Sequence, residues 1–146
     1  MIVSLAVALC AQETYRCIRV VDGDGGTIIV EIDGTKERVR LIGVDTPETV
    51  HPKKPVEHYG KEASAFTKKL TEGEMVRLEY DDDTQRRDRY GRLLVYVYLP
   101  DGTFLNAGII KQGYGFAYTR FPSKYMEQFR QYERSARESW AGLWAK

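Results

Sequence analysis

The chain has 146 residues, of which 42% are hydrophobic and ten are tyrosines. That is enough for the packed core of one ordinary domain, and it excludes a disordered chain. With 22 basic and 21 acidic residues, the net charge is close to zero. No overall positive field therefore draws a polyanion from a distance, and any nucleic acid must be held by a local cluster of cations.

The first segment, residues 1–14, is expected to be a signal-like or disordered extension. Ile2–Cys10 is almost wholly apolar and far too short to span a bilayer. It is typical of the apolar part of an export signal cut before Ala11, although the usual basic start is missing. We therefore expect a secreted or extracytoplasmic protein; the alternatives are a frayed terminus or a buried first strand. Cys10 and Cys17 could pair only if the segment is retained.

Alternating patterns predict three strands in the first half, Tyr15–Val21, Thr27–Ile32 and Arg38–Val44. Between the last two, Asp33-Gly34 is a strong hairpin signal. A polar loop with two prolines follows at His51–Tyr59.

The second half mixes helical and strand patterns. Ala63, Phe66 and Leu70 have helical spacing. The expected elements are a helix at Gly60–Leu70, strands at Glu74–Asp81 and Leu93–Leu99 separated by a charged loop at Asp82–Arg92, and helices at Phe104–Gly113 and Tyr125–Trp140. Five short strands with turn signals, closed by helices, predict an α+β domain over residues 15–146: a five-stranded barrel of the oligonucleotide-binding (OB) fold with three α-helices.

The stretch VVDGDGGTIIVEIDG, Val20–Gly34, places acidic groups and glycines between two strands. One interpretation is a plain turn, since Asp and Gly are common turn residues. The other is an oxygen-ligand site for a hard cation, where glycine lets the backbone come close.

The stretch RVRLIGVDTPETVHPKK, Arg38–Lys54, carries the most chemistry. A strand delivers Arg40 and then ends at Asp45, because Pro47 cannot continue a central strand. Asp45 and Glu48 are thus two carboxylates at the mouth of a strand, and a second loop downstream supplies Arg92.

These residue types suit the cleavage of a phosphodiester. Arginine forks match the phosphoryl oxygens on which charge builds. A metal held by carboxylates can neutralise another oxygen, and a carboxylate that the metal does not use can take a proton from water. Taken singly, Arg40, Glu48 and Arg92 are more often surface ion pairs or caps; together and in this order they favour a site.

Several segments closely resemble the staphylococcal-type thermonucleases: VVDGD, RVRLIGVDTPET, HPKK, YGKEASAFTKKL, RDRYGR and the terminal GLW. The resemblance covers roughly residues 17–144. It implies an OB-fold barrel with three helices, and a calcium-dependent phosphodiesterase that cuts DNA and RNA, single strands included, and leaves 3′-phosphates. It implies a monomer with no stable protein partner and no membrane span.

The resemblance also implies roles for single residues. Arg40 and Arg92 resemble the phosphate-binding arginines, and Glu48 resembles the general base. Asp45 and Thr46 are similar to calcium ligands, the latter through its backbone carbonyl. The residues that match substrate-binding positions are Lys53, Lys54, Tyr90 and Tyr118.

The remaining calcium ligand is ambiguous, because the family runs from its second aspartate directly into threonine. Aligned on Val20-Val21, the ligand is Asp24 and Gly25-Gly26 is an insertion. Aligned on Thr27, the ligand position is Gly26 and a ligand is lost. We favour Asp24, and we expect the two glycines to loosen its carboxylate.

The second alignment defines a rival function. An OB barrel that no longer cuts, because its metal site is damaged, would be a single-strand-binding module that works by charge and stacking. The near-neutral charge argues mildly against a pure binder. His51 and His58 are not expected to be zinc ligands, since no other ligand residues cluster with them.

Overall fold

The computed structural model describes residues 13–21, 24–47 and 58–145. The export-like segment, together with Asp22, Glu48, Lys53 and Lys54, lies outside the described residues. Within them, no helix is both long and apolar enough to cross a membrane.

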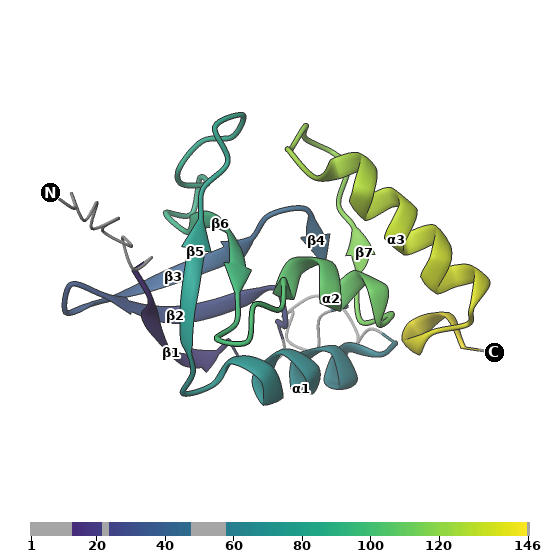
Figure 1. The fold of residues 1–146 in the computed structure, drawn as a ribbon, viewed down its shortest axis with the longest axis horizontal. Helices are drawn as coiled ribbons and strands as arrows, with labels where there is room; N and C mark the ends of the chain where they lie inside the picture. The colour runs from purple at the N-terminus through teal and green to yellow at the C-terminus, as the bar shows by residue number, and fades with distance from the viewer. Residues whose placement is uncertain (1–12, 22–23, 48–57, 146) are drawn as a thin grey trace, which may run out of the picture.

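The centre of the molecule is a closed five-stranded barrel, as expected (Figure 1). Its strands, in the order in which they pair, are β1 (Tyr15–Val20), β2 (Thr27–Ile32), β3 (Thr35–Leu41), β6 (Leu93–Tyr98) and β5 (Met75–Glu79). Only the β3–β6 pair is parallel. Closure leaves no open sheet edge, and it brings β2 and β3 beside β6, far along the chain.

The β2–β3 hairpin confirms the turn prediction. Asp33 and Gly34 have φ angles of 51° and 81°, which are the left-handed values that a two-residue type I′ turn requires at both positions. The pairing is uninterrupted from Ile32 opposite Thr35 to Thr27 opposite Arg40. The hairpin therefore fixes where Arg40 lies relative to the start of β2.

The strand predicted to run to Val44 is broken, which corrects the sequence interpretation. β3 ends at Leu41, and a separate short strand, β4 (Val44–Asp45), pairs with β7 (Phe116–Ala117) in a second sheet. Gly43 makes the break with a φ of 77°. A Cβ at this position would lie 2.7 Å from the ring of Phe129, so the close approach of α3 requires glycine here.

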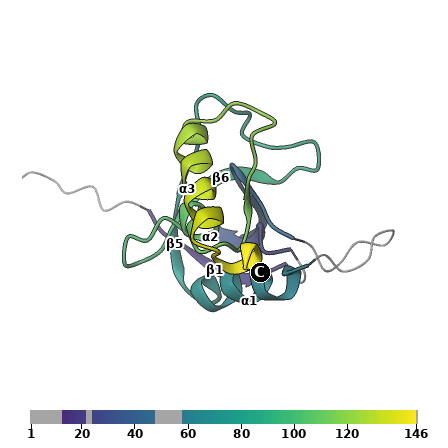
Figure 2. The ribbon, with the colours of Figure 1, turned by 90° about the vertical axis from the view of Figure 1, so that its right-hand side faces the viewer.

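The three predicted helices are present with slightly different ends, and they cover the barrel. They are α1 (Gly60–Thr71), α2 (Leu105–Lys111) and α3 (Met126–Glu138), followed by a short 3₁₀ turn, η1 (Gly142–Trp144). α1 passes beneath the barrel, and α2 lies between the barrel and α3 (Figures 1 and 2). β4 and β7 lie between the barrel and α3 as well (Figure 1).

A buried asparagine ties α2 to the barrel. The Asn106 side chain donates to the carbonyls of Ile42 and Val95, at 2.9 and 3.3 Å, and accepts from the Val97 amide at 2.9 Å. All its bonds go to backbone beside the end of β3 or within β6. Fully satisfied buried polar groups specify one arrangement, so Asn106 orients the chain just before the β4 segment.

A buried carboxylate joins the loop after β5 to the segment before α3. Asp81 accepts hydrogen bonds from the Tyr96 hydroxyl at 2.6 Å and from the amides of Lys124 and Asp83, each at 2.8 Å. Burial by itself raises the pKa of Asp81, but these hydrogen bonds outweigh it and hold the pKa below its ordinary value. The ionised form is therefore the one that the fold stabilises.

Asp81→Asn should destabilise the fold by about 1–3 kcal/mol at neutral pH, because the amide cannot accept the same three bonds. A carboxyl whose pKa is depressed by folding stabilises above its unfolded pKa, near 3.9 for Asp, and loses that contribution as pH falls through the folded pKa. In urea unfolding, the gap between wild type and variant should therefore be full at pH 7 and close on acidification. A gap that stays constant to pH 2 would contradict this role.

Candidate active site

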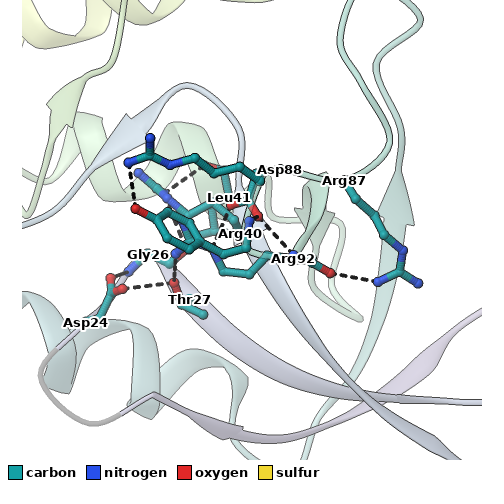
Figure 3. A network of polar contacts seen from close by, with 11 residues as sticks. Asp24, Gly26, Thr27, Arg40, Leu41, Arg87, Asp88 and Arg92 are labelled. Atoms are coloured by element: carbon teal, nitrogen blue, oxygen red, sulfur yellow. Dashed lines mark hydrogen bonds and ion pairs between the residues drawn. The ribbon is translucent and has the colours of Figure 1, made fainter.

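Arg40 lies near the C-terminal end of β3, in the centre of a polar cluster (Figure 3). It pairs with Thr27 of β2 on one side and with Leu94 of β6 on the other. Its guanidinium Nη1 donates to the Leu41 carbonyl at 2.9 Å and more weakly to the Gly26 carbonyl at 3.4 Å. One nitrogen is thus fixed by backbone, while the rest of the fork has no protein bond among the described residues.

Four other predicted site residues lie close enough to Arg40 to act on its charge. Burial lowers the pKa of Arg40 below its ordinary value, and the nearby Arg92 lowers it further. The acidic groups of Asp24, Asp45 and Tyr118 act in the opposite direction. Arginine remains charged in proteins even so, and two cations held close together form a strong local site for an anion.

Arg92 is positioned from two sides (Figure 3). Its Nε donates to Asp88 Oδ2 at 2.7 Å, and its amide donates to Asp88 Oδ1 at 3.0 Å. Its Nη1 donates to the Thr27 hydroxyl at 3.2 Å. Burial raises the pKa of Asp88, but the bonds from Arg92 outweigh it and hold the pKa below its ordinary value. Asp88 therefore stays ionised and keeps the guanidinium aimed at β2.

Tyr90 stands beside Arg92 on the same loop and is 68% exposed. The Arg92 guanidinium lies 5.5 Å from the centre of its ring, and the Arg89 guanidinium lies 4.8 Å from it. Arg89 Nη2 also donates to the Tyr90 hydroxyl at 2.6 Å. The structure thus places Tyr90 beside Arg92 and Arg89.

The Asp24 carboxylate is held at both oxygens. Oδ1 accepts from the Gly26 amide at 3.0 Å, and Oδ2 accepts from the Thr27 hydroxyl at 2.9 Å. The expectation that the following glycines loosen this carboxylate is therefore wrong. A carboxylate offers about four acceptor positions, so two hydrogen bonds leave room for a cation.

Gly25 and Gly26 are part of the fold rather than a loose insertion. The Gly25 carbonyl accepts from the buried Thr67 hydroxyl at 2.9 Å, and a Cβ at Gly25 would lie 3.0 Å from the Ala63 carbonyl oxygen of α1. The Gly26 carbonyl accepts from the Leu41 amide at 3.0 Å. Deleting the pair would remove both connections and should therefore disturb the site.

Asp24 and residue 26, the two candidate positions for the calcium ligand, lie beside each other in the structure. A Cβ at Gly26 would point into the cluster, 2.8 Å from Arg40 Nη1 and 3.4 Å from Asp24 Oδ1. The carboxylate of Asp24 thus lies within contact of the position that a side chain at residue 26 would take. An acidic group is present beside Arg40 even though residue 26 is glycine.

Asp45 belongs to the second sheet, and Thr46 and Tyr118 directly follow its two strands. Asp45 is exposed at the end of β4, opposite Phe116 of β7, and the Tyr118 amide donates to the Gly43 carbonyl at 2.8 Å. Thr46 is buried, and its hydroxyl has no hydrogen-bond partner among the described residues. The pairing of β4 with β7 is what brings Tyr118 to the arginine cluster.

The donor set fits a hard cation. Asp24 and Asp45 each supply carboxylate oxygens close enough to act on Arg40, and the Thr46 hydroxyl, which has no hydrogen-bond partner among the described residues, adds another oxygen. Calcium takes such ligands in flexible geometry, together with carbonyls and water. The described part of the chain contains no group of three or more His, Cys, Asp or Glu that could hold a metal, so two carboxylates would have to be completed by carbonyls and water.

Arg87 is turned away from the cluster (Figure 3). Its two terminal nitrogens donate to the carboxylate of Glu37 at 3.0 and 3.1 Å, and Nη1 also donates to the Gly91 carbonyl at 2.8 Å. The bonds from Arg87 lower the pKa of Glu37. This arginine ties the loop to β3 instead of facing the site.

Sequence reasoning missed two members of the cluster, Thr27 and Asp88. The Thr27 hydroxyl connects Asp24 to Arg92, since it donates to the Asp24 carboxylate and accepts from the Arg92 guanidinium (Figure 3). Asp88 could have been found from its position four residues before Arg92, a spacing that suits an ion pair across a tight turn. Thr27 carried no such signal, because a threonine that begins a strand is common.

Comparisons with known proteins show which family the chain is similar to. The family model described as "Staphylococcal nuclease homologue" matches residues 38–146. The chain is 47% identical over 135 residues to the thermonucleases of Staphylococcus hyicus and of Staphylococcus intermedius, which covers 92% of this chain and 77% of each relative. It is 42% identical over 130 residues to endonuclease YncB of Bacillus subtilis, covering 88% of this chain and 60% of that protein.

Proposed function

Because this chain belongs to the family of staphylococcal nuclease homologues and is a nuclease, we propose that it is a calcium-dependent phosphodiesterase. Its substrates are single-stranded DNA and RNA, and its products carry 3′-phosphates. The observation that carries the proposal is the convergence of Arg40, Arg92, Asp24 and Asp45 on one end of the barrel.

The two arginines bind the phosphodiester anion. Arg40 has one nitrogen fixed by backbone carbonyls, and Arg92 has Nε fixed by Asp88, so neither guanidinium has to be ordered when substrate arrives. Preorganised donors of this kind stabilise the charge that grows on the phosphoryl oxygens in the transition state. Tyr90 and Tyr118 flank this position and contact the neighbouring nucleotide.

Asp24, Asp45 and the Thr46 carbonyl would hold the calcium ion. When bound, the ion supplies a positive charge that neutralises a phosphoryl oxygen and orients it. Without a cation, Asp24 and Asp45 would repel the phosphate that the arginines attract. The carboxylates therefore make cleavage depend on the metal, and this dependence separates the enzyme from a simple anion-binding surface.

Glu48 acts as the general base in this proposal, and Lys53 and Lys54 contact the substrate backbone. Glu48 follows Pro47 directly in sequence, and Lys53 and Lys54 come later in the same segment. All three lie outside the described residues, so their roles rest on the sequence pattern. Glu48 removes a proton from water, the water oxygen forms a bond to phosphorus, and the bond from phosphorus to the 5′-oxygen breaks. The proton ends on the 5′-hydroxyl product, and the phosphate stays on the 3′-oxygen.

Incubating the purified protein with denatured DNA and with RNA, in calcium and then in a chelator, tests the proposal. Cleavage should occur in calcium and stop in the chelator. The new ends should accept labelled phosphate at the 5′-hydroxyl without prior phosphatase treatment. Cleavage that persists in the chelator, or 5′-phosphate ends, would contradict it. Binding without cleavage would instead support the single-strand-binding alternative.

Asp24→Asn should weaken calcium binding about ten- to a hundredfold, because a charged ligand is lost while the hydrogen bonds to Gly26 and Thr27 can largely persist. Calorimetric titration of the folded variant measures this. Asp22→Asn, in the same acidic stretch, and Asp82→Asn, exposed on a different loop, are the matched controls and should bind as wild type does. Equal affinity of Asp24→Asn and wild type would remove Asp24 from the metal site.

The proposal also covers the localisation and the oligomeric state of the protein. An export-like N-terminal stretch supports a secreted or extracytoplasmic nuclease that works as a monomer. Gel filtration at several concentrations, and the N-terminal sequence of protein recovered from the producing cells, would test these two points.

A further inference from the structure

Two exposed aromatic side chains, on different loops, each neighbour a residue assigned to the proposed active site. Among the described residues, the exposed large hydrophobic side chains are Met75, Tyr90, Phe121 and Trp140. Tyr90 borders Arg92. Phe121, which is 62% exposed, has its ring centre 6.3 Å from that of Tyr118, the tyrosine whose hydroxyl influences Arg40.

Each of these two aromatic residues is preceded in the chain by an arginine that lies over its ring. The Arg89 guanidinium is 4.8 Å from the Tyr90 ring centre, and the Arg120 guanidinium is 5.6 Å from the Phe121 ring centre. An exposed aromatic face with a cation beside it binds single strands well, because the base stacks and the cation attracts the phosphate. Scattered exposed apolar residues need no explanation, but both of these rings neighbour residues to which the proposed function assigns phosphate or nucleotide binding.

We infer that Phe121 and Arg120 form a second nucleobase subsite, next to the position bordered by Tyr118. Its ligand is the unstacked base, with its phosphate, of the nucleotide adjoining the one at the cleavage site. The ring is tilted by 52° from that of Tyr118, so the two rings offer separate faces instead of one shared wall. A duplex keeps its bases stacked, and the subsite therefore favours single strands over duplexes.

This inference rests on the proposed function but concerns only how longer substrates are held. A substrate with a single base reaches the arginines and Tyr118 but has no second base to occupy Phe121. The subsite should therefore contribute to KM for oligonucleotides and leave kcat unchanged, because it lies beyond the groups that contact the reacting phosphate.

The test compares Phe121→Ala, Phe121→Tyr and wild type on three substrates. These are a single-stranded oligonucleotide of about 12 nucleotides, the matching duplex, and thymidine 3′-(4-nitrophenyl phosphate), which carries one base. Phe121→Ala should raise KM about tenfold on the single strand, through loss of one stacked base. Its kcat on the single strand, and both constants on the other two substrates, should be unchanged. Phe121→Tyr should restore the single-strand KM.

Trp140→Ala is the matched control, since it removes another exposed aromatic ring beyond the end of α3 and should leave every constant unchanged. An unchanged single-strand KM in folded Phe121→Ala would overturn the inference. So would an equal rise in KM on the one-base substrate, because Phe121 would then only support Tyr118. If wild type cleaved none of the three substrates, the proposed function would fail, and that result is distinct from either outcome.

Discussion

Arg40→Lys and Arg92→Lys are each expected to lower kcat/KM about a hundred- to a thousandfold, although both keep the positive charge. A lysine ammonium cannot make a planar two-point contact with a phosphate. At position 92 it also cannot donate to Asp88 and reach the Thr27 hydroxyl at the same time, as Nε and Nη1 of the arginine do. Removing a single preorganised donor already costs roughly this factor.

The measurement is steady-state cleavage of single-stranded DNA at saturating calcium by variants whose unfolding transitions match wild type. Arg38→Lys is the matched control, because Arg38 is an exposed arginine two residues before Arg40 on the same strand. It should cut at the wild-type rate. If both site variants also cut normally, the phosphate clamp would lie elsewhere. Arg89 would then be the next candidate, since Arg87 is already bound by Glu37.

Glu48→Gln is expected to lower kcat by about 10²–10⁴-fold, the usual contribution of a general base. In sequence, Glu48 comes directly after Asp45-Thr46-Pro47, the stretch that carries two of the proposed metal ligands. Glutamine has nearly the same shape but cannot accept the proton. The fold, calcium affinity and nucleotide binding should therefore be preserved.

Two measurements separate this role from a purely structural one. The Kd for a nucleoside 3′,5′-bisphosphate in calcium should stay within about twofold of wild type, a change well below one tenfold step in affinity. Raising the pH should partly recover the rate of the glutamine variant, because hydroxide then replaces the lost base. An unchanged kcat at saturating substrate would remove Glu48 from catalysis.

Local patterns in the sequence predicted the main elements but not the short strands β4 and β7. The ranges expected for β1, β2, β5 and β6 lie within a few residues of the observed strands. Asp33-Gly34 predicted the hairpin, since few other residue pairs accept two left-handed conformations. The same reasoning overran at Gly43: the ring of Phe129, more than eighty positions away in the chain, forces the break there, and no local pattern reports such a neighbour.

The residue types of the site were also evident from the sequence, but their arrangement was not. The barrel closes β2 onto β3 and β3 onto β6, and so brings the Thr27 hydroxyl within 3.2 Å of Arg92 across 65 positions. The sequence alone could not decide whether Asp24 or residue 26 occupies the position of the family's calcium ligand. In the tertiary structure, the Asp24 carboxylate accepts hydrogen bonds from the Thr27 hydroxyl and the Gly26 amide. Spacing along the chain determines on which face of a strand a side chain lies. Which side chains from distant strands come into contact depends on how the barrel closes.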